Sequence, residues 1–293
     1  MIQAQPLPSQ SRARPQGVAT AAAVIVLTAC SGGANTDVAA PPAVAEVSAV
    51  AQLPPVQLAE GRTLGALARA NLAKPRPAAP IDLTGTYNFK VEGLDANGHE
   101  FLPHPKLTPK AQAFLDKKTA YRARGFEYLE NAGSCWPYGV PQIMTRYWPV
   151  QFVQLPTMVL VLSMVTSNVR RIYTDGRPHP PVEDLVMTYN GDSIGRWEGK
   201  TLVVDTIGFT GLRHYVSDGV PGGEKLHVVE RISLSEDGNT LQIEFTMTDP
   251  DHWEGEWKNT KRYTREEDLD IQEHICIYEE EAKLPAFKKN LSE

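Results

Sequence analysis

The feature that most restricts the fold is the alternation of apolar and polar residues over positions 147–278. Runs rich in Val, Ile, Thr and aromatic residues are separated by turn residues about every eight to twelve positions, which is typical of antiparallel strands. Glu198-Gly199 and Asp237-Gly238 each separate two such runs and indicate hairpins. The predicted strands are Tyr147–Leu155, Met158–Val165, Val169–Thr174, a strand that ends at Trp197, Thr201–Asp205, Leu226–Leu234, Thr240–Thr248, Glu256–Arg265 and Ile271–Tyr278.

So many consecutive strands predict a mainly β fold, either an antiparallel barrel or a strongly curved sheet, because closure removes exposed strand edges. A β-sandwich is the alternative. Thr108-Pro109 predicts the start of the longest helix, with a hydroxyl cap and a proline at the first position, and an apolar pattern continues toward Gly133. We expect this one N-terminal helix to pack on the barrel. A shorter amphipathic helix is predicted within Leu58–Ala73, where leucines recur at helical spacing before Pro75.

The N-terminus has the organisation of a bacterial lipoprotein signal peptide. Arg12 and Arg14 precede an uncharged apolar run, Val18–Ala29, that is too short to span a bilayer. Small residues directly before Cys30 suit signal-peptide cleavage and lipidation of that thiol. A chance cysteine behind an ordinary signal peptide is the alternative. Because Ser31 does not signal retention in the inner membrane, we expect export and a lipid anchor in the outer membrane, facing the periplasm.

Four regions are predicted along the chain. Residues 1–29 are the signal peptide, and residues 30–56, rich in Ala, Pro and Val without an aromatic residue, are a flexible tether. Residues 57–80 are a short helix and linker, and residues 81–293 are a single β-rich domain. Removing residues 1–29 takes away two arginines and no acid, so the formal charge changes from −6 to −8. This acidic balance gives no basic surface for nucleic acid.

With Cys30 assigned to lipid, Cys135 and Cys276 remain in a compartment that oxidises thiols. A disulfide between them is the simplest prediction. A reactive free thiol is the alternative, and a zinc site would need the paired cysteine spacing that these two residues lack. No metal site is therefore predicted.

The loop Asp175–Pro180 concentrates an acid, a base and a guanidinium between two predicted strands. His179 can move a proton near neutral pH, with Asp175 orienting its ring. The nearby arginines that can bind an oxyanion or a carboxylate are Arg170, Arg171 and Arg177. The alternative is ordinary turn chemistry that the prolines stiffen.

Two carboxylates fall on the apolar faces of predicted strands. Glu230 shares a face with Val228 and Ile232, and Glu273 shares one with the isoleucines of 271–277. Such carboxylates must be paired or protonated, since an unpaired ion in a dry interior is prohibitively costly. Together in a cavity they can act as acid and base. The alternative is a set of internal salt bridges to arginines such as Arg170 or Arg231.

A second acidic and aromatic group follows the strand Thr240–Thr248. Asp249, His252 and Trp253 can supply a stacking surface and a base, with turn packing as the alternative. Tyr173 and Trp197 are among the aromatic residues predicted to line a site for a planar or hydrophobic ligand. Core packing is the alternative for most of these aromatic residues.

Several stretches carry a family resemblance: Cys135–Pro141, Arg171–Pro180, Ser193–Val204, Glu230-Arg231, Asp249-Pro250 and Cys276. In this combination the chain resembles a large, functionally uncharacterised group of exported bacterial proteins. Asp82–Tyr87 also looks like the first strand of lipocalin-like barrels. The resemblance supports the domain limits, the exported setting and a lipocalin-like barrel, and it implies no reaction.

The sequence contains no Walker loop, dinucleotide-binding glycine pattern, His-Glu-x-x-His zinc helix or Gly-x-Ser-x-Gly elbow. We therefore predict no cofactor. The first functional hypothesis is an envelope lipoprotein whose barrel binds a hydrophobic or aromatic small molecule. The alternative is a cofactor-independent isomerase, dehydratase or lyase that uses acid/base catalysis in the same cavity.

The two hypotheses differ in what they require of the fold. The enzyme is favoured if one pocket brings together Asp175, His179, Glu230 and His252, whereas scattered positions favour binding. A third hypothesis, an envelope assembly partner, predicts a broad exposed apolar patch. The expected partners are thus a small molecule and, through the lipid anchor, a membrane, with any protein partner left open.

Overall fold

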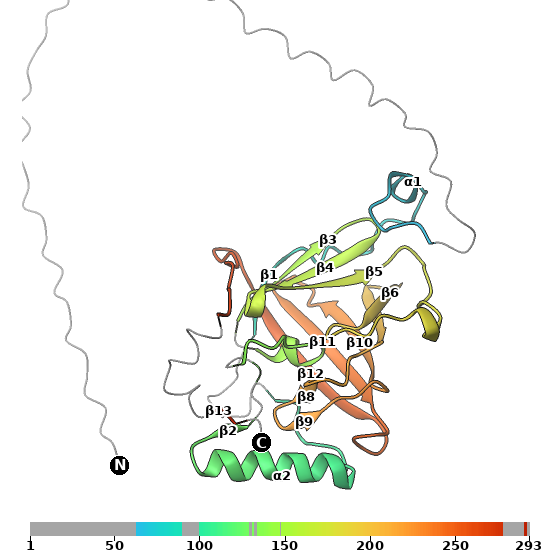
Figure 1. Ribbon diagram of the computed structural model, residues 1–293. Coiled ribbons are helices and arrows are strands. Elements are labelled where there is room, and N and C mark those ends of the chain that lie inside the picture. The colour runs from blue at the N-terminus through green and yellow to red at the C-terminus, as the bar shows by residue number, and fades with distance from the viewer. Residues whose placement is uncertain are drawn as a thin grey trace, which may run out of the picture. The chain divides into compact units, whose positions relative to one another are not determined.

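The computed structural model describes residues 63–89, 100–128, 131, 134–146, 148–277 and 290–291. Its central feature is a closed barrel of nine strands (Figure 1). The barrel strands are β1 Gly85–Phe89, β3 Val150–Gln154, β4 Met158–Ser163, β5 Asn168–Tyr173, β6 Asp192–Glu198, β7 Thr201–Ile207, β10 His227–Leu234, β11 Thr240–Thr248 and β12 Trp257–Glu266. The predicted mainly β barrel is confirmed, and it is consistent with the resemblance to lipocalin-like barrels.

One parallel pair interrupts the otherwise antiparallel wall. The strand order is β1-β12-β11-β10-β7-β6-β5-β4-β3, and β3 pairs back to β1. Only β5 and β6 are parallel, with Ile172 opposite Ser193 and Tyr173 opposite Ile194. Directions cannot alternate throughout a closed ring with an odd number of strands, so one parallel pair is a geometric requirement. Residues 174–191, the crossover segment, make this connection because a tight turn cannot join parallel strands.

Side chains along each strand alternate between the barrel interior and its outer face. In β10, Val228, Glu230 and Ile232 are buried, whereas Arg231 between them is exposed. Residues of the interior core include Tyr87, Phe152, Val161, Ile172, Leu202, Val204, Ile243, Phe245 and Tyr263. The rings of Tyr87 and Phe152 meet edge to face with centroids 5.6 Å apart, so β1 and β3 close the barrel through side chains as well as backbone.

The longest helix, α2 Pro109–Ala123, begins where the sequence predicts. The Thr108 hydroxyl accepts a hydrogen bond from the Ala111 amide at 3.4 Å, and Pro109 occupies the first turn. The helix ends well before Gly133 because Gly125 takes a left-handed conformation with φ of +80°. The apolar pattern after Ala123 therefore predicts too long a helix.

Helix α2 packs on a hairpin outside the barrel wall, β8 Tyr215–Ser217 and β9 Val220–Pro221 (Figure 1). The Phe114 and Tyr215 rings have centroids 5.7 Å apart, and Lys118 Nζ lies 2.6 Å from Asp218 Oδ1. A second short pair joins β2 Glu127–Tyr128 to β13 Asn290–Leu291 in parallel. Three 3-10 turns follow within the described residues: η2 Gln142–Thr145, η3 Val165–Ser167 and η4 Val182–Asp184.

The shorter predicted helix lies only partly within the described residues. Within the described part of Leu58–Ala73, only α1 Arg69–Leu72 is helical. Leu67 is 57% exposed and Leu72 41%, whereas Asn71 is buried. The prediction of an apolar helix face is wrong here because a polar contact of Asn71, described below, holds this segment in place.

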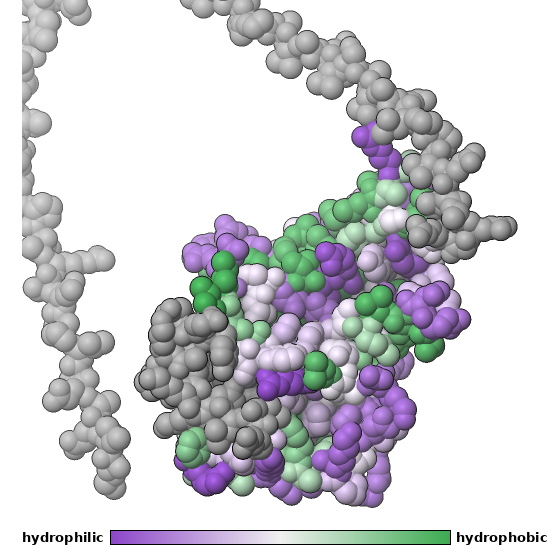
Figure 2. All heavy atoms as spheres, viewed as in Figure 1, coloured by the Kyte–Doolittle hydropathy of each residue, from purple (hydrophilic) through white to green (hydrophobic). Residues whose placement is uncertain are grey.

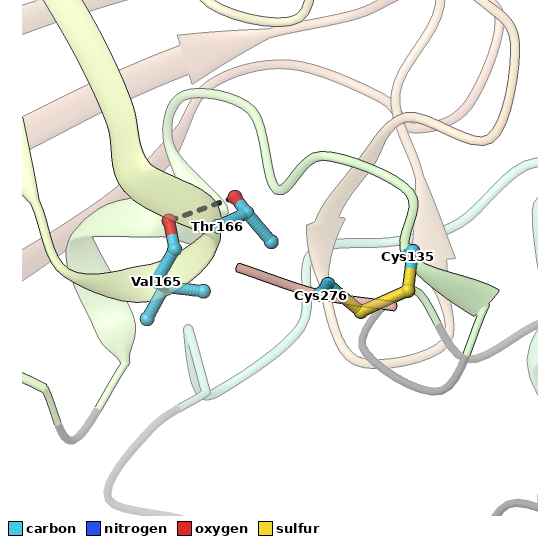
Figure 3. The surroundings of a disulfide bond; sticks show 4 residues. All are labelled: Cys135, Val165, Thr166 and Cys276. Atoms are coloured by element: carbon cyan, nitrogen blue, oxygen red, sulfur yellow. Dashed lines mark hydrogen bonds between the residues drawn. A yellow bond between two sulfur atoms is a disulfide. The ribbon is translucent and has the colours of Figure 1, made fainter. Parts of the chain in front are cut away.

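The predicted strand Ile271–Tyr278 is also wrong. Residues 271–277 pair with no other strand in the described part of the chain, and Glu273 and Ile275 are exposed. The segment is attached by the predicted disulfide between Cys135 and Cys276, whose Cα atoms are 5.5 Å apart (Figure 3). This distance lies in the usual range for disulfides. Glu273 consequently faces away from any apolar interior and needs no buried partner.

The predicted signal peptide, the lipidation site Cys30 and the tether lie outside the described residues. Those expectations therefore stay predictions. Among the described residues, no helix combines the length and apolar character that crossing a membrane requires.

Candidate functional site

A hollow lies at one end of the barrel, where β5 and β6 both end and β3 turns into β4. We call it the mouth cleft, and its volume is about 790 Å³. Trp197 and Val159, from the inward faces of β6 and β4, line it together with Leu155. The residues that line it are Arg76, Pro77, Ala78, Ala79, Pro80, Asp82, Gln154, Leu155, Pro156, Val159, Thr174, Asp175, Gly176 and Trp197. The proline-rich stretch 76–80 thus forms one wall of the opening.

Asp175 connects the segment that precedes this wall to the crossover segment. Its carboxylate accepts hydrogen bonds from Arg177 Nε at 2.8 Å and Nη2 at 2.6 Å, and from Asn71 Nδ2 at 2.7 Å. The hydrogen bonds from Arg177 are the main cause that lowers the pKa of Asp175 to about 2. Arg177 also donates to the Leu64 carbonyl and stacks over the Tyr173 ring. Asp175 is therefore an ionised link near neutral pH between the N-terminal segment and the crossover segment, and it does not orient His179 as expected.

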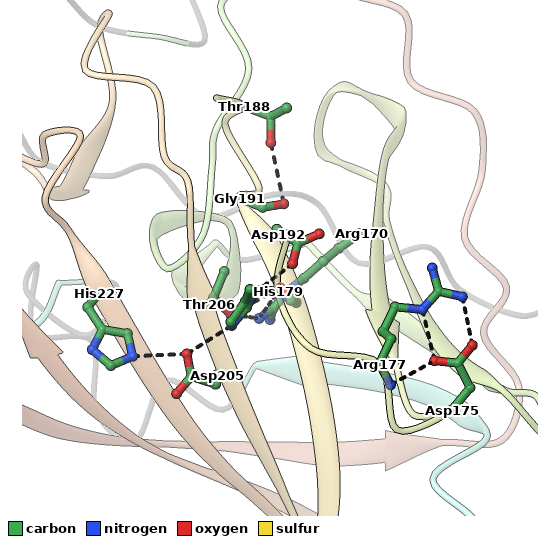
Figure 4. Close-up of polar contacts among 11 residues, drawn as sticks. Arg170, Asp175, Arg177, His179, Thr188, Gly191, Asp192, Asp205, Thr206 and His227 are labelled. Carbon is green, nitrogen blue, oxygen red and sulfur yellow. Dashed lines mark hydrogen bonds and ion pairs between the residues drawn. The ribbon is translucent and has the colours of Figure 1, made fainter. Parts of the chain in front are cut away.

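His179 instead bridges two other carboxylates on the outer face of the barrel (Figure 4). Its Nδ1 lies 2.6 Å from Asp192 Oδ1, and its Nε2 lies 3.2 Å from Asp205 Oδ1. Asp205 Oδ1 is also 3.0 Å from His227 Nε2. These four residues, which we call the histidine–carboxylate chain, fasten the crossover segment across β6, β7 and β10.

His227 and Asp205, at one end of the histidine–carboxylate chain, have a defined pH response. The hydrogen bond to Asp205 raises the pKa of His227 above its ordinary 6.5, and the same bond lowers the pKa of Asp205 below its ordinary 3.8. A raised histidine pKa stabilises the fold below the unfolded-state pKa and stops doing so as pH rises through the folded-state value. A lowered aspartate pKa stabilises above the unfolded-state value and stops as pH falls through the folded one. The contribution of the pair is thus largest between about pH 4 and 6.5.

We expect His227→Asn to lower the free energy of unfolding by roughly 0.5 kcal/mol more at about pH 5.5 than at about pH 8.5, a small value because solvent screens both half-exposed groups. Urea denaturation at the two pH values measures this difference. Asp205→Asn should abolish the same pH dependence. The double variant, Asp205→Asn with His227→Asn, should show no further change in it. If His227→Asn loses the same free energy of unfolding at both pH values, the role assigned to the pair is contradicted.

Inside the barrel, Glu230 and Arg170 form a fully buried ion pair. Arg170 Nη1 donates to Glu230 Oε1 at 3.0 Å, and Nη2 donates to Oε2. Arg170 also donates to Ser193 Oγ at 3.3 Å and to Thr206 Oγ1 at 3.1 Å. Every charged atom therefore has a partner within the barrel. Of the alternatives open for Glu230, the geometry matches the internal salt bridge to Arg170.

Asp249, His252 and Trp253 form a buried turn. Asp249 Oδ2 accepts from the Gly223 amide at 2.7 Å and lies 2.8 Å from His252 Nδ1. Trp253 is fully buried and contacts the Trp257 ring. The expected stacking surface is absent here because the indole ring is part of the core.

The predicted site residues thus lie in separate places. Asp175, Arg177 and Trp197 lie at or beside the mouth cleft, and Arg171, Tyr173 and His179 belong to the outer face near the crossover segment. Glu230 and Arg170 are in the barrel interior, His252 is in the buried turn, and Glu273 is in the disulfide-linked segment. The candidate acid and base residues do not converge on one pocket.

Sequence analysis missed Asp192, Asp205 and His227. Each occupies an outward position on its strand, where a polar residue is expected and carries no signal of its own. Within the described ranges, no three His, Cys, Asp or Glu side chains are placed to hold a metal ion. Comparison with known proteins supplies no assignment: no protein-family model matches this chain, and no curated protein matches it.

Proposed function

We propose that this protein is an exported lipoprotein, anchored through Cys30 in the outer membrane and facing the periplasm, whose barrel binds a hydrophobic or aromatic small molecule in the mouth cleft. The observation that carries the binding proposal is the cleft itself, an opening of about 790 Å³ at the end of the barrel. The anchor and the location rest on the sequence of residues 1–31.

The shape and chemistry of the cleft support a small apolar ligand. Its volume falls within the range of about 300–1,000 Å³ that is usual for small-molecule pockets. Trp197, Val159 and Leu155 provide apolar contact, while Gln154 and Arg76 can orient a polar end of the ligand. On the face seen in Figure 2, hydrophobic residues lie in several groups among hydrophilic ones, so this face lacks the single broad apolar patch of an assembly partner.

Trp197→Ala is expected to weaken binding of an uncharged fluorescent probe, N-phenyl-1-naphthylamine, at least about tenfold, because the indole is the largest apolar side chain of the cleft. Fluorescence titration of residues 31–293 measures the affinity. Trp148→Ala is the matched control, since Trp148 is 41% exposed and does not line the cleft. Equal affinity in both variants would place the probe elsewhere and contradict the proposal.

One specific observation favours the acid/base alternative: His179 lies between Asp192 and Asp205. Such a histidine can pass a proton between two carboxylates. Mass spectrometry of organic extracts from purified wild type, Trp197→Ala and His179→Ala separates the two functions. A compound that is lost only with Trp197→Ala indicates a carrier, whereas an unconverted precursor that accumulates only in His179→Ala indicates an enzyme.

A further inference from the structure

The short stretch around helix α1 exposes apolar side chains and buries a polar one. Asn71 is 3% exposed, whereas Leu67 is 57% exposed and Leu72 is 41% exposed. Arg69 and Lys74 are exposed beside these leucines, and neither pairs with a carboxylate among the described residues. We call residues 67–74 the docking segment.

Polar contacts attach this stretch to the crossover segment. Asn71 Nδ2 donates to Asp175 Oδ2 at 2.7 Å, and Arg177 Nη2 donates to the Leu64 carbonyl at 2.9 Å. Asn71 Oδ1 accepts a hydrogen bond from Arg76 Nη2 at 2.5 Å, so both ends of the asparagine amide are bonded. A single exposed leucine is ordinary on a protein surface. Two of them around a buried asparagine leave an apolar surface that the fold itself does not use.

The chain on either side of the docking segment indicates which surface covers it. Cys30, the predicted lipidation site, precedes it across the predicted tether, which keeps the segment near the bilayer at a high effective concentration. Residues 76–80, which follow it, form one wall of the mouth cleft. Leucine side chains enter the boundary between headgroups and acyl chains, while Lys and Arg stay among the headgroups. The exposed side chains of the docking segment therefore match a lipid surface.

We propose that the docking segment lies on the membrane that carries the lipid anchor. Leu67 and Leu72 insert at the headgroup boundary, and Arg69 and Lys74 contact anionic headgroups. The lipid chains already hold the protein on the membrane, so this contact fixes its orientation. It places the mouth cleft at the bilayer surface, where a hydrophobic ligand enters without crossing bulk water. The inference rests on the anchor and on the ligand class proposed above.

A fluorescent thiol label tests this contact in the full protein, purified with its lipid and reconstituted in vesicles. Ala70→Cys places the label at an exposed position of the docking segment, and Ala113→Cys places it at an exposed position of α2, at the other end of the barrel (Figure 1). Lipids that carry a nitroxide quencher just below the headgroup should quench the label at position 70 and not the label at position 113. Equal quenching at both positions, or none at position 70, overturns the proposal.

The leucines are tested by exchange for a polar residue of similar size. Leu67→Gln with Leu72→Gln is expected to lower the ratio of quenched to unquenched label roughly twentyfold, because the exposed half of each leucine contributes about fivefold. Leu212→Gln is the matched control, since Leu212 is 60% exposed but follows the end of β7 opposite the mouth cleft. It should leave the quenching unchanged. Equal quenching in wild type and in the docking-segment variant overturns the role of the leucines.

The cations are tested by changing the lipid. Arg69→Gln with Lys74→Gln is expected to lower the same ratio roughly twentyfold on anionic vesicles, about fivefold for each charge, and to change little on zwitterionic ones. A loss that is equal on both kinds of vesicle overturns the contact with anionic headgroups.

Two further measurements separate this inference from the proposed function. Flotation with the vesicles tests the anchor, and titration with N-phenyl-1-naphthylamine tests the mouth cleft. Protein that floats and binds the probe, yet shows no quenching at position 70, overturns docking alone, whereas protein that fails to float overturns the anchor and docking together. Quenching at position 70 without probe binding supports the membrane contact and overturns only the ligand role of the cleft. Burial of the label without quenching, if it increases with the protein-to-lipid ratio, indicates a second copy of the chain as the occupant and overturns membrane docking.

Discussion

Replacing Glu230 with glutamine is expected to lower the free energy of unfolding by about 3–5 kcal/mol, because the change leaves the Arg170 guanidinium charged and unpaired inside the barrel. Glu230 is 0% exposed and Arg170 is 2% exposed, so water cannot replace the lost carboxylate. Ser193 and Thr206 remain as hydrogen-bond acceptors, but their hydroxyls carry no compensating charge. Equilibrium unfolding in guanidinium chloride, followed by tryptophan fluorescence, measures the loss.

Glu198→Gln is the matched control for this variant. Glu198 pairs with Arg231 at 2.8 Å on the outer face, where their side chains are 41% and 45% exposed. Removing that carboxylate should cost far less stability than removing the Glu230 carboxylate, since water solvates Arg231 and Arg196, the two arginines that pair with Glu198. Equal losses from the two variants would contradict the assignment of Glu230 to a dry interior.

A double variant distinguishes structural from functional use of the buried pair. Arg170→Met with Glu230→Leu removes both charges, and we expect its stability to equal or exceed that of wild type. Ser193 Oγ and Thr206 Oγ1, which lie 3.0 Å apart, can still bond to each other. If this variant also binds the fluorescent probe normally, the pair contributes to the barrel core and not to the mouth cleft.

The strands were predictable where local patterns and tertiary pairing agree. Thr240–Thr248 follows the Asp237-Gly238 turn with alternating residues, and β11 has these same bounds. Alternation failed over residues 271–277, where the pattern exists but no described strand pairs with it. The alternation shows only that a segment can be a strand, because strand formation also needs a neighbour to satisfy the backbone.

The arrangement of the candidate sites was much less predictable. The inward position of Glu230 follows from its place between Val228 and Ile232, so the need for a buried partner was visible in the sequence. The histidine–carboxylate chain was not visible, since it joins residues from three strands and the crossover segment. The parallel pair of β5 and β6 was not visible either, since it is required only once the number of strands in the closed barrel is known.

Removing the disulfide is the other change with a large expected effect. Cys135 and Cys276 are separated by 141 positions, so the bond restricts a very long loop of the unfolded chain. In the chain-entropy model, a Cys135→Ser, Cys276→Ser variant loses up to about 5 kcal/mol of stability, and measured values are often smaller. Urea denaturation of the variant and of wild type, each with and without dithiothreitol, measures this loss.

The same variant is expected to release residues 271–277 before the barrel unfolds. Besides the disulfide, the segment is held by two hydrogen bonds between the His274 backbone and Ser167 Oγ, each 3.0 Å, and by the contact of the His274 ring with Trp148. The segment has no hydrogen-bonded ladder with a described strand, which predicts local opening at a small free-energy cost, whereas the barrel strands share continuous ladders. Limited proteolysis should therefore cut the variant within 271–277 while the barrel remains intact. Dithiothreitol should produce this cleavage in wild type and add nothing in the variant; resistance of both reduced forms would show that other contacts hold the segment.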